Sequence, residues 1–190
     1  MNLKFIFVLN EIKIDNYIIK KDEVGIIACE EKNYYIVNFS SADYPLKISK
    51  NNVKLFNPLQ TGDSFERKIC NVCNRLLPVS QFAKNQNGKN NRTVRRPSCN
   101  NCREIIDGVD IPATLKKEWE KEKPNYIIWE CPICKKKNIP GITSKVVLDH
   151  NHETGVPRAW ICDSCNTGLG RFKDDINLLQ SAIDYLKKFE

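Results

Sequence analysis

The sequence predicts an α+β fold that is divided into three small modules, at residues 1–64, 65–129 and 130–190. Three observations support this prediction. Short β-branched and aromatic runs fill the first module, four Cys-x-x-Cys pairs occupy the other two, and a helical apolar pattern ends the chain. A segment of about 60 residues buries only about 60% of its unfolded surface, so modules of this size usually need a covalent or metal staple. The paired cysteines are the obvious candidates.

Residues 1–64 are expected to form a small β-barrel, with an SH3-like barrel as the first guess. Runs rich in β-branched and aromatic residues lie at 5–9, 17–19, 23–29, 34–39, 46–48 and 53–56, and polar turn residues separate them. Short strands at such regular spacing suggest a closed barrel. The unpaired Cys29 lies in an apolar run with Ile26, Ile27 and Ala28, and we expect it to be a buried core thiol.

The second module, residues 65–129, contains the first set of cysteines: Cys70, Cys73, Cys99 and Cys102. Because 25 residues separate its two pairs, the spacer must contain structure rather than a simple turn. Residues 116–123 then form a highly charged stretch of good helix formers that ends at Pro124. We expect a solvated connecting helix there and assign it no chemistry.

The third module, residues 130–190, contains the second set of cysteines: Cys131, Cys134, Cys162 and Cys165. Its 27-residue spacer is expected to hold strands at 145–148 and 158–161, joined by a turn at 153–155, and a helix is expected to begin near Cys165. The tail is expected to be a second helix, capped by Asp174 or Asp175. Its apolar stripe is interpreted as core packing and consists of Leu178, Leu179, Ala182, Ile183 and Leu186.

The cysteine pattern favours metal over disulfides. No secretory signal is visible, because Glu11 ends the first apolar run early, and no apolar stretch approaches 18 residues. We therefore expect a cytoplasmic protein that does not contact a membrane, in a compartment that keeps thiols reduced. Each Cys-x-x-Cys pair points two thiolates at one ion, and two pairs complete a tetrahedral, purely structural Zn²⁺ site. Pairing within each set closes the shorter loops and predicts two Zn²⁺ per chain, although pairing across the sets is possible.

The net charge of +7 is concentrated in the middle of the chain. Residues 1–64 carry 8 basic and 8 acidic side chains, residues 65–129 carry 13 and 7, and residues 130–190 carry 9 and 8. From Leu76 to Arg103 there is no acidic residue, and Asn and Gln alternate there with Lys84, Lys89, Arg92, Arg95 and Arg96. Lys and Arg suit phosphates and guanine, while Asn and Gln can pair with adenine edges. This segment is a candidate DNA-contacting loop, and the alternative is a flexible solvated loop.

The chain's two histidines, His150 and His152, both lie between the pairs of the second cysteine set. Asp149 adds a carboxylate beside His150, and Asn166 adds an amide at the expected helix start. Hydrolysis of a phosphodiester needs a base that activates water and a hard cation that neutralises the phosphate. Histidine titrates near neutral pH, and Mg²⁺ prefers oxygen ligands. An Asp-His pair alone is more often a turn, and such an Asn is often only a helix cap, but a four-cysteine frame favours a nuclease site.

The segment from Cys131 to Leu186 closely resembles the endonuclease VII-like branch of the ββα-metal nucleases, also called His-Me finger or HNH nucleases. The shared signature is a cysteine pair, Leu-Asp-His-x-His-x-Thr-Gly at 148–155, an arginine-bearing strand, and a second pair followed by Asn166 and Gly-Leu-Gly at 168–170. The resemblance implies that His150 is the general base and that Asp149 and Asn166 hold one catalytic Mg²⁺ or Mn²⁺. It gives His152 and Arg158 supporting roles.

Two positions depart from the family's pattern. Ala159-Trp160 stands where a glycine often follows the arginine, and Asn151 stands where an aspartate often separates the histidines. We therefore interpret His152 as a residue that orients the site rather than as a metal ligand. The middle module resembles a knuckle unit found beside many such nucleases, with Phe82 after the first cysteine pair and Arg95-Arg96-Pro97 before the second.

The whole chain resembles a small Type II restriction endonuclease of this class, which would cut double-stranded DNA at a specific sequence. A homodimer is then expected, since two-fold proteins match palindromic sites, and no small-molecule substrate is expected. The first module could bind DNA, mediate dimer contacts or serve as a scaffold. The alternatives are a Holliday-junction or branched-DNA resolvase and a non-catalytic zinc-ribbon DNA-binding regulator. The regulator would leave Asp149, His150 and Asn166 without a role.

Overall fold

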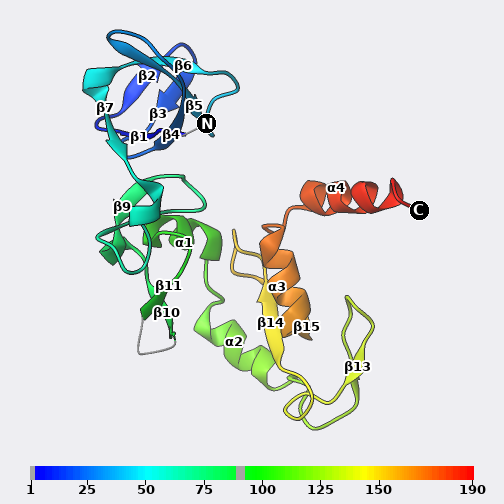
Figure 1. The fold of residues 1–190 in the computed structure, drawn as a ribbon. Coiled ribbons are helices and arrows are strands. Elements are labelled where there is room, and N and C mark those ends of the chain that lie inside the picture. Colours follow the sequence, from blue (N-terminus) through cyan, green and yellow to red (C-terminus); the bar gives the residue numbers. More distant parts are fainter. Residues whose placement is uncertain (1–2, 89–92) are drawn as a thin grey trace. The chain divides into compact units, whose positions relative to one another are not determined.

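The computed structural model of the protein describes residues 3–88 and 93–190 (Figure 1). The chain divides into two compact units, Met1–Glu104 and Ile105–Glu190, which we call unit 1 and unit 2. The finer division into three modules remains a prediction. In the part of the chain that the structure describes, no helix is long and apolar enough to cross a membrane.

Unit 1 begins with a five-stranded antiparallel sheet in the order β6-β5-β4-β1-β7. Its strands are β1 (Phe5–Val8), β4 (Val24–Glu30), β5 (Tyr34–Phe39), β6 (Leu46–Ser49) and β7 (Val53–Phe56). A separate hairpin pairs β2 (Ile12–Ile14) with β3 (Tyr17–Ile19). Every run expected to be a strand in this module is a strand, and β2 is an additional one. Their apolar side chains form one core: Ile6, Val8, Ile19, Tyr35, Val37, Phe39, Leu46, Ile48 and Val53.

The sheet is open, so the closed barrel expected from the sequence is not observed. Its two edge strands, β6 and β7, are not paired with each other in the described part of the chain. Only the 3-10 turn Lys50–Asn52 joins them. Four residue steps reach at most about 14 Å, so the sheet must curl until its edges approach at one end. The sheet therefore curves, but no pairing between β6 and β7 closes it into a barrel in the described part of the chain.

Cys29 is exposed, so the expectation of a buried thiol is wrong. The register of β4 against β5 shifts between Ile27 and Cys29. Such a bulge moves the following side chains to the opposite face of the sheet. Ile27 packs against the core, whereas Cys29 lies outside it.

The first cysteine set lies in the turn of one hairpin and at the start of a helix, and a second hairpin lies between them in the chain. β8 (Arg67–Ile69) pairs with β9 (Leu76–Pro78), β10 (Lys84–Asn87) pairs with β11 (Thr93–Arg95), and α1 is Asn100–Asp107. Short 3-10 turns occupy Pro58–Gln60 and Val79–Gln81. The Val24 N–H donates to the Asn74 carbonyl at 2.9 Å, and the Leu76 N–H donates to the Asp22 carbonyl at 2.8 Å. These bonds tie the β8–β9 hairpin to the start of β4 within unit 1.

Unit 2 has the strand-strand-helix order expected from the sequence. It contains α2 (Ala113–Glu120), β12 (Trp129–Glu130), β13 (Lys137–Asn138), β14 (Val146–His150), β15 (Pro157–Cys162), α3 (Asp163–Arg171) and α4 (Ile176–Lys187). β14 and β15 form an antiparallel pair, and α3 packs beside both strands. The connecting helix was expected at 116–123. α2 begins three residues earlier, directly after Pro112, and ends before Pro124.

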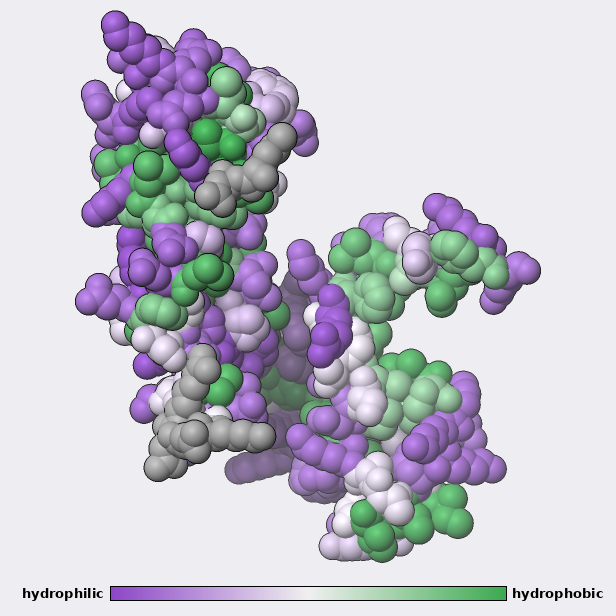
Figure 2. Space-filling model, viewed as in Figure 1, coloured by the Kyte–Doolittle hydropathy of each residue, from purple (hydrophilic) through white to green (hydrophobic). Residues whose placement is uncertain are grey.

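Helix α4 begins at Asp175, whose carboxylate accepts hydrogen bonds from the N–H groups of Asn177 at 2.7 Å and Leu178 at 3.3 Å. The interpretation of its apolar stripe as core packing is wrong for three of the five side chains. Leu178, Ile183 and Leu186 are 41%, 47% and 63% exposed, and Figure 2 shows apolar surface along this helix. α3 already packs against both strands of the β14–β15 hairpin. Helical spacing of apolar residues predicts a shared helix face but not the element that covers it.

Candidate active site and metal centres

The structure brings the eight paired cysteines together in two clusters, each made from one set. Cys70, Cys73, Cys99 and Cys102 form the first, and Cys131, Cys134, Cys162 and Cys165 form the second; within each cluster the sulfur atoms lie within 4.8 Å of one another. None of the nine cysteines, all of them described, forms a disulfide. In the first cluster, the N–H groups of Val72 and Cys99 donate to the Cys70 Sγ at 3.4 and 3.3 Å.

Four thiols this close cannot all ionise without a cation. Burial opposes ionisation of Cys70 and Cys131, but backbone N–H groups that donate to their sulfurs lower the pKa of Cys70 to about 7 and that of Cys131 to about 6. Burial and the neighbouring thiols raise the pKa of Cys165 to about 12, and they raise the pKa of Cys102 as well. A divalent cation would remove this conflict. Four sulfur ligands in tetrahedral reach suit Zn²⁺.

The candidate catalytic residues Asp149 and His150 lie at the end of β14. Asp149 is buried, with 6% of its surface exposed, and pairs in register with Ala159 on β15. The register then shifts, so that His150 pairs with Pro157. A bulge of this kind redirects side chains and is common beside active sites. The His150 ring lies against the His152 ring, with centroids 4.8 Å apart and planes tilted by 35°.

One ring nitrogen of His150 has no partner. Its Nε2 is buried and makes no hydrogen bond to any described residue. A buried polar atom without a partner costs about 1–3 kcal/mol, so it is uncommon unless a bound molecule completes it. The ring also borders a cleft within unit 2, which is lined by α2 and β14 and includes Lys116, Lys123 and Trp160. An imidazole in this position can exchange a proton with a molecule bound in the cleft.

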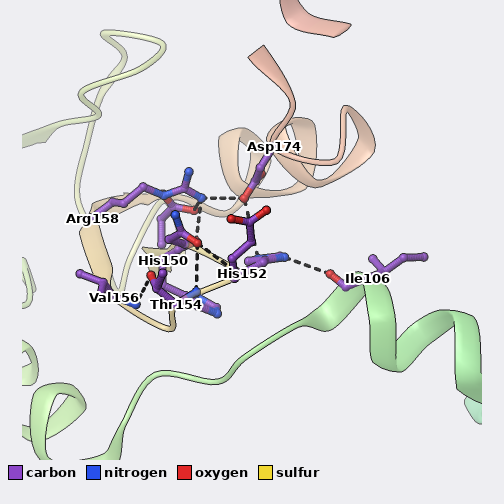
Figure 3. A network of polar contacts seen from close by, with 10 residues as sticks. Ile106, His150, His152, Thr154, Val156, Arg158 and Asp174 are labelled. Carbon is purple, nitrogen blue, oxygen red and sulfur yellow. Dashed lines mark hydrogen bonds and ion pairs between the residues drawn. The ribbon is translucent and has the colours of Figure 1, made fainter. Parts of the chain in front are cut away.

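Arg158, on β15, lies at the centre of a polar network around the site (Figure 3). Its Nε is 2.7 Å from Asp149 Oδ2, and its Nη2 donates to Asp149 Oδ1 at 3.2 Å. The same Nη2 donates to the His150 carbonyl at 2.7 Å and to Asp174 Oδ2 at 2.6 Å. Burial lowers the pKa of Arg158, but the bonds to the two carboxylates outweigh it and raise that pKa. One guanidinium thus bridges two acidic side chains.

Asp174 is the residue of this network that the sequence did not indicate. The sequence offered it only as one of two possible caps for the last helix, and Asp175 is the cap. Its side chain is 16% exposed and also lies 3.9 Å from His152 Nε2. The contact depends on how the chain turns between α3 and α4, which no short motif reports.

His152 is held by the segment that precedes α2. Its Nδ1 lies 3.0 Å from the Ile106 carbonyl, and because a carbonyl only accepts, Nδ1 carries the proton of this bond. The Val109 N–H donates to the His152 carbonyl at 2.7 Å. Gly108 permits this approach, because it has φ +64° and a Cβ there would lie 2.1 Å from the His152 oxygen. These contacts fix the position of His152 beside His150.

Asn166 lies on α3, which packs against β14, and its side chain is partly buried. Asp149 and Asn166 therefore offer oxygen atoms from two packed elements of unit 2. A carboxylate and an amide oxygen suit a hard divalent cation such as Mg²⁺ or Mn²⁺. The donor types fit such an ion, and in this structure the Arg158 guanidinium neutralises Asp149.

The described ends of the basic segment of unit 1 are paired strands, since residues 84–87 form β10 and residues 93–95 form β11. Lys84 is exposed, and Arg96 is partly buried. Arg95 has a structural contact, because its Nη1 donates to the Phe82 carbonyl at 2.7 Å and its N–H donates to Asp63 Oδ2 at 3.1 Å. Lys89 and Arg92 lie outside the described residues.

Comparisons with known proteins agree with this architecture. Residues 114–188 match the family model of recombination endonuclease VII, and residues 58–108, which contain β8 to β11 and α1, match the His-Me finger endonuclease beta4-alpha2 domain. Gene 59 proteins of Mycobacterium phages D29 and L5 are 44% identical over 59 residues and 39% identical over 57. Each alignment covers 30% of this chain and 34% of the phage protein. The chain thus spans about a third of the length of these curated relatives.

The similarity extends over nearly the whole chain in one solved structure. The β-β-α-Me type II restriction endonuclease Hpy99I matches with a TM-score of 0.88 and 39% sequence identity, over 98% of this chain and 98% of that chain. Identity at this level over both units shows a shared family and not only a shared fold. The resemblance expected from the sequence is confirmed. The chain therefore belongs to the ββα-Me, or His-Me finger, endonucleases.

Proposed function

We propose that the protein is a Type II restriction endonuclease that cuts double-stranded DNA at a specific sequence. The observation that carries the proposal is the position of His150 in the ββα unit, with a buried, unpartnered Nε2 beside the cleft lined by α2 and β14. The relation to Hpy99I over both units supports the restriction activity. No small molecule is proposed as substrate.

In the proposed mechanism, His150 accepts a proton from the water that attacks the scissile phosphate. Asp149 and Asn166 would hold one Mg²⁺ or Mn²⁺, which when bound neutralises the phosphate and stabilises the leaving oxygen. His152 keeps the His150 ring in place through the ring contact at 4.8 Å, and the Ile106 carbonyl fixes His152 in turn. Arg158 holds the backbone of His150 through its carbonyl. The catalytic histidine is thus oriented from both sides.

We further propose that both four-cysteine clusters bind Zn²⁺ and that these ions are structural. Four thiolates leave no coordination position for substrate. Cysteines that bind zinc rather than form disulfides suit a reducing compartment, and we therefore propose a cytoplasmic location.

Sequence-specific cutting of both strands calls for two active sites, and we therefore propose a homodimer on DNA. Helix α4 offers apolar surface for a contact with another protein chain, because three of its side chains are exposed: Leu178, Ile183 and Leu186. The β10–β11 hairpin is the proposed DNA-contacting element. Lys84 and Arg96 are its described candidates, with Lys89 and Arg92 predicted from the sequence, whereas the structural bond of Arg95 makes it a weaker one.

Digestion of plasmid DNA by the purified protein with Mg²⁺ tests the proposal. We expect discrete DNA fragments with Mg²⁺ and no cleavage when EDTA removes the Mg²⁺. A smear would indicate a nuclease without sequence specificity, and an absence of cutting under all metal conditions would favour a DNA-binding regulator.

A junction-resolving endonuclease is the second candidate, because residues 114–188 match the model of recombination endonuclease VII. That match covers unit 2 without the β10–β11 hairpin. Cleavage of a synthetic four-way junction and of a linear duplex with the same arms separates the two functions. We expect cutting that depends on sequence in both substrates; a preference for the junction regardless of sequence would establish the resolvase.

A further inference from the structure

The proposed metal ligand Asp149 has both carboxylate oxygens engaged by Arg158, at 2.7 and 3.2 Å. A guanidinium and a divalent cation on the same carboxylate repel each other, and a bidentate guanidinium occupies one lone pair on each oxygen. A cation that binds Asp149 must therefore compete with Arg158. The affinity for the cation then depends on where the Arg158 guanidinium can move.

Asp174 offers that position. Its Oδ2 accepts from Arg158 Nη2 at 2.6 Å, the shortest contact of this guanidinium. Lys173 and Asp174 both have left-handed backbones, with φ of 58° and 54°. Such conformations are uncommon for residues other than glycine, and they often mark functional sites. The Asp174 N–H donates to the Leu169 carbonyl at 3.1 Å, which fixes the turn to α3.

We propose that Asp174 is a positioning residue that retains Arg158 when Asp149 turns to the catalytic cation, and that it thereby sets the affinity for that cation. This inference rests on the proposed function, since it takes Asp149 as a metal ligand. Arg158 already bridges the two carboxylates, so a small movement toward Asp174 frees Asp149. Without the Asp174 charge, Asp149 is the remaining carboxylate partner of Arg158, and the metal must displace a stronger pair.

A purely structural role for Asp174 gives different expectations. If the Arg158–Asp174 pair only holds the turn between α3 and α4, either substitution should loosen the site and weaken metal binding. If Arg158 competes with the metal, its removal should strengthen metal binding. The direction of the Arg158 effect therefore separates the two roles.

The test is Mn²⁺ binding by the full-length, zinc-loaded protein, measured by electron paramagnetic resonance without DNA. We expect Asp174→Asn to weaken Mn²⁺ binding about five- to tenfold and Arg158→Gln to tighten it by a similar factor, the lower range for coupled sites. In the double variant, Asp174→Asn should have less than about a twofold further effect, because its action passes through Arg158. Asp174→Glu should restore most of the affinity.

Asp175→Asn is the matched control, because it removes a charge one residue away and asparagine preserves the helix cap. It should change Mn²⁺ affinity less than about twofold, as expected for an exposed charge. Zinc content and circular dichroism check that each variant is folded. If Asp174→Asn does not fold, the Arg158→Gln result decides.

Two different failures can be told apart. Mn²⁺ binding that survives in Asp149→Asn overturns the metal site of the proposed function. If binding depends on Asp149, but Arg158→Gln weakens it or Asp174→Asn acts equally with and without Arg158, only the role of Asp174 is overturned.

Discussion

The two four-cysteine clusters have nearly the same frame but enclose different structures. Their spacers are 25 and 27 residues long. The first encloses β9 and the β10–β11 hairpin, in a stretch without acidic residues, whereas the second encloses β13, β14 and most of β15, with Asp149 and His150. Because the two four-cysteine frames are alike, the frame does not determine the chemistry. The hairpin inserted into each frame does.

The clusters also differ in how they are supported. Cys70 and Cys99 share a buried apolar cluster with Leu77 and Phe82. In the second cluster Cys131 is buried but Cys134 is exposed, and the next three residues are lysines. The first cluster has apolar packing beside its thiols, and we therefore expect the second to depend more on a bound metal.

The largest expected effect is that of breaking each frame. Cys131→Ser and Cys70→Ser should each lower the zinc content from two ions to one, because a structural site that loses a thiolate loses much of its binding energy of about 10–16 kcal/mol. Cys131→Ser should also unfold most of unit 2 and abolish cleavage. Cys70→Ser should keep the strand core of unit 1. Elemental analysis and limited proteolysis measure both effects.

Two results would contradict the expected difference between the two clusters. Equal proteolysis of both units in the two variants would show that packing around Cys70 adds nothing. A zinc content that stays at two would show that the cysteines are not structural ligands.

Gly108→Ala tests whether the segment before α2 orients the site that the second cysteine set encloses. The new Cβ would lie 2.1 Å from the His152 carbonyl, so the segment that holds His152 must shift. A misplacement of about 1 Å can cost about 100-fold in rate, and we expect a 10- to 100-fold slower cleavage with both zinc ions retained. Gly168→Ala, which meets nothing within 4 Å, is the stability control and should raise the melting temperature slightly. A Gly108→Ala enzyme with the wild-type rate would show that this contact does not orient the site.

The hairpin in the first frame should show a smaller effect, on DNA binding. Lys84→Ala should weaken binding to all duplexes and lower the salt slope by about one charge. Arg96→Ala should cost about 1–3 kcal/mol at the cognate site alone if Arg96 reads a base. Arg95→Ala should instead lower stability by about 1 kcal/mol, because it loses the bond to the Phe82 carbonyl. Titrations with cognate and random duplexes at two salt concentrations, together with thermal melts, sort these effects. Equal losses on both duplexes for all three variants would make the hairpin a nonspecific electrostatic contact.

The smallest expected effect is at α4. Asp175→Ala should destabilise this helix by about 1 kcal/mol, and Asp175→Asn should be nearly neutral. Because three apolar side chains of α4 are exposed, we expect faster hydrogen exchange within α4 only. Faster exchange throughout unit 2 would show that α4 supports the active site.

The parts of the fold and of the site that depend on short sequence patterns could be predicted from the sequence. Cysteine pairs gave both clusters, and the motif around Asp149 and His150 gave the strand-strand-helix unit, because ligands and turn residues within a few positions of each other dictate local geometry. The strands of residues 1–64 followed from their β-branched runs. The closed barrel failed, since closure depends on pairing between β6 and β7, which no local pattern predicts.

The remaining differences are long-range. The bulge that exposes Cys29 depends on the register against β5. The contact between Arg158 and Asp174, 16 residues apart, depends on a turn with two left-handed residues. The exposure of α4 depends on how much apolar surface the rest of unit 2 offers. Tertiary packing decides each of these, and a single sequence carries little signal for it.

Removing the imidazole of His150 tests the claim that this residue is the general base of a DNA endonuclease. Cleavage of plasmid DNA with Mg²⁺ is timed for the wild type and for His150→Ala, with zinc content and DNA affinity measured on the same samples. We predict a rate lower by about 10²- to 10⁴-fold, the usual contribution of a general base, with two zinc ions and unchanged DNA affinity. Cleavage by His150→Ala at the wild-type rate would contradict the claim.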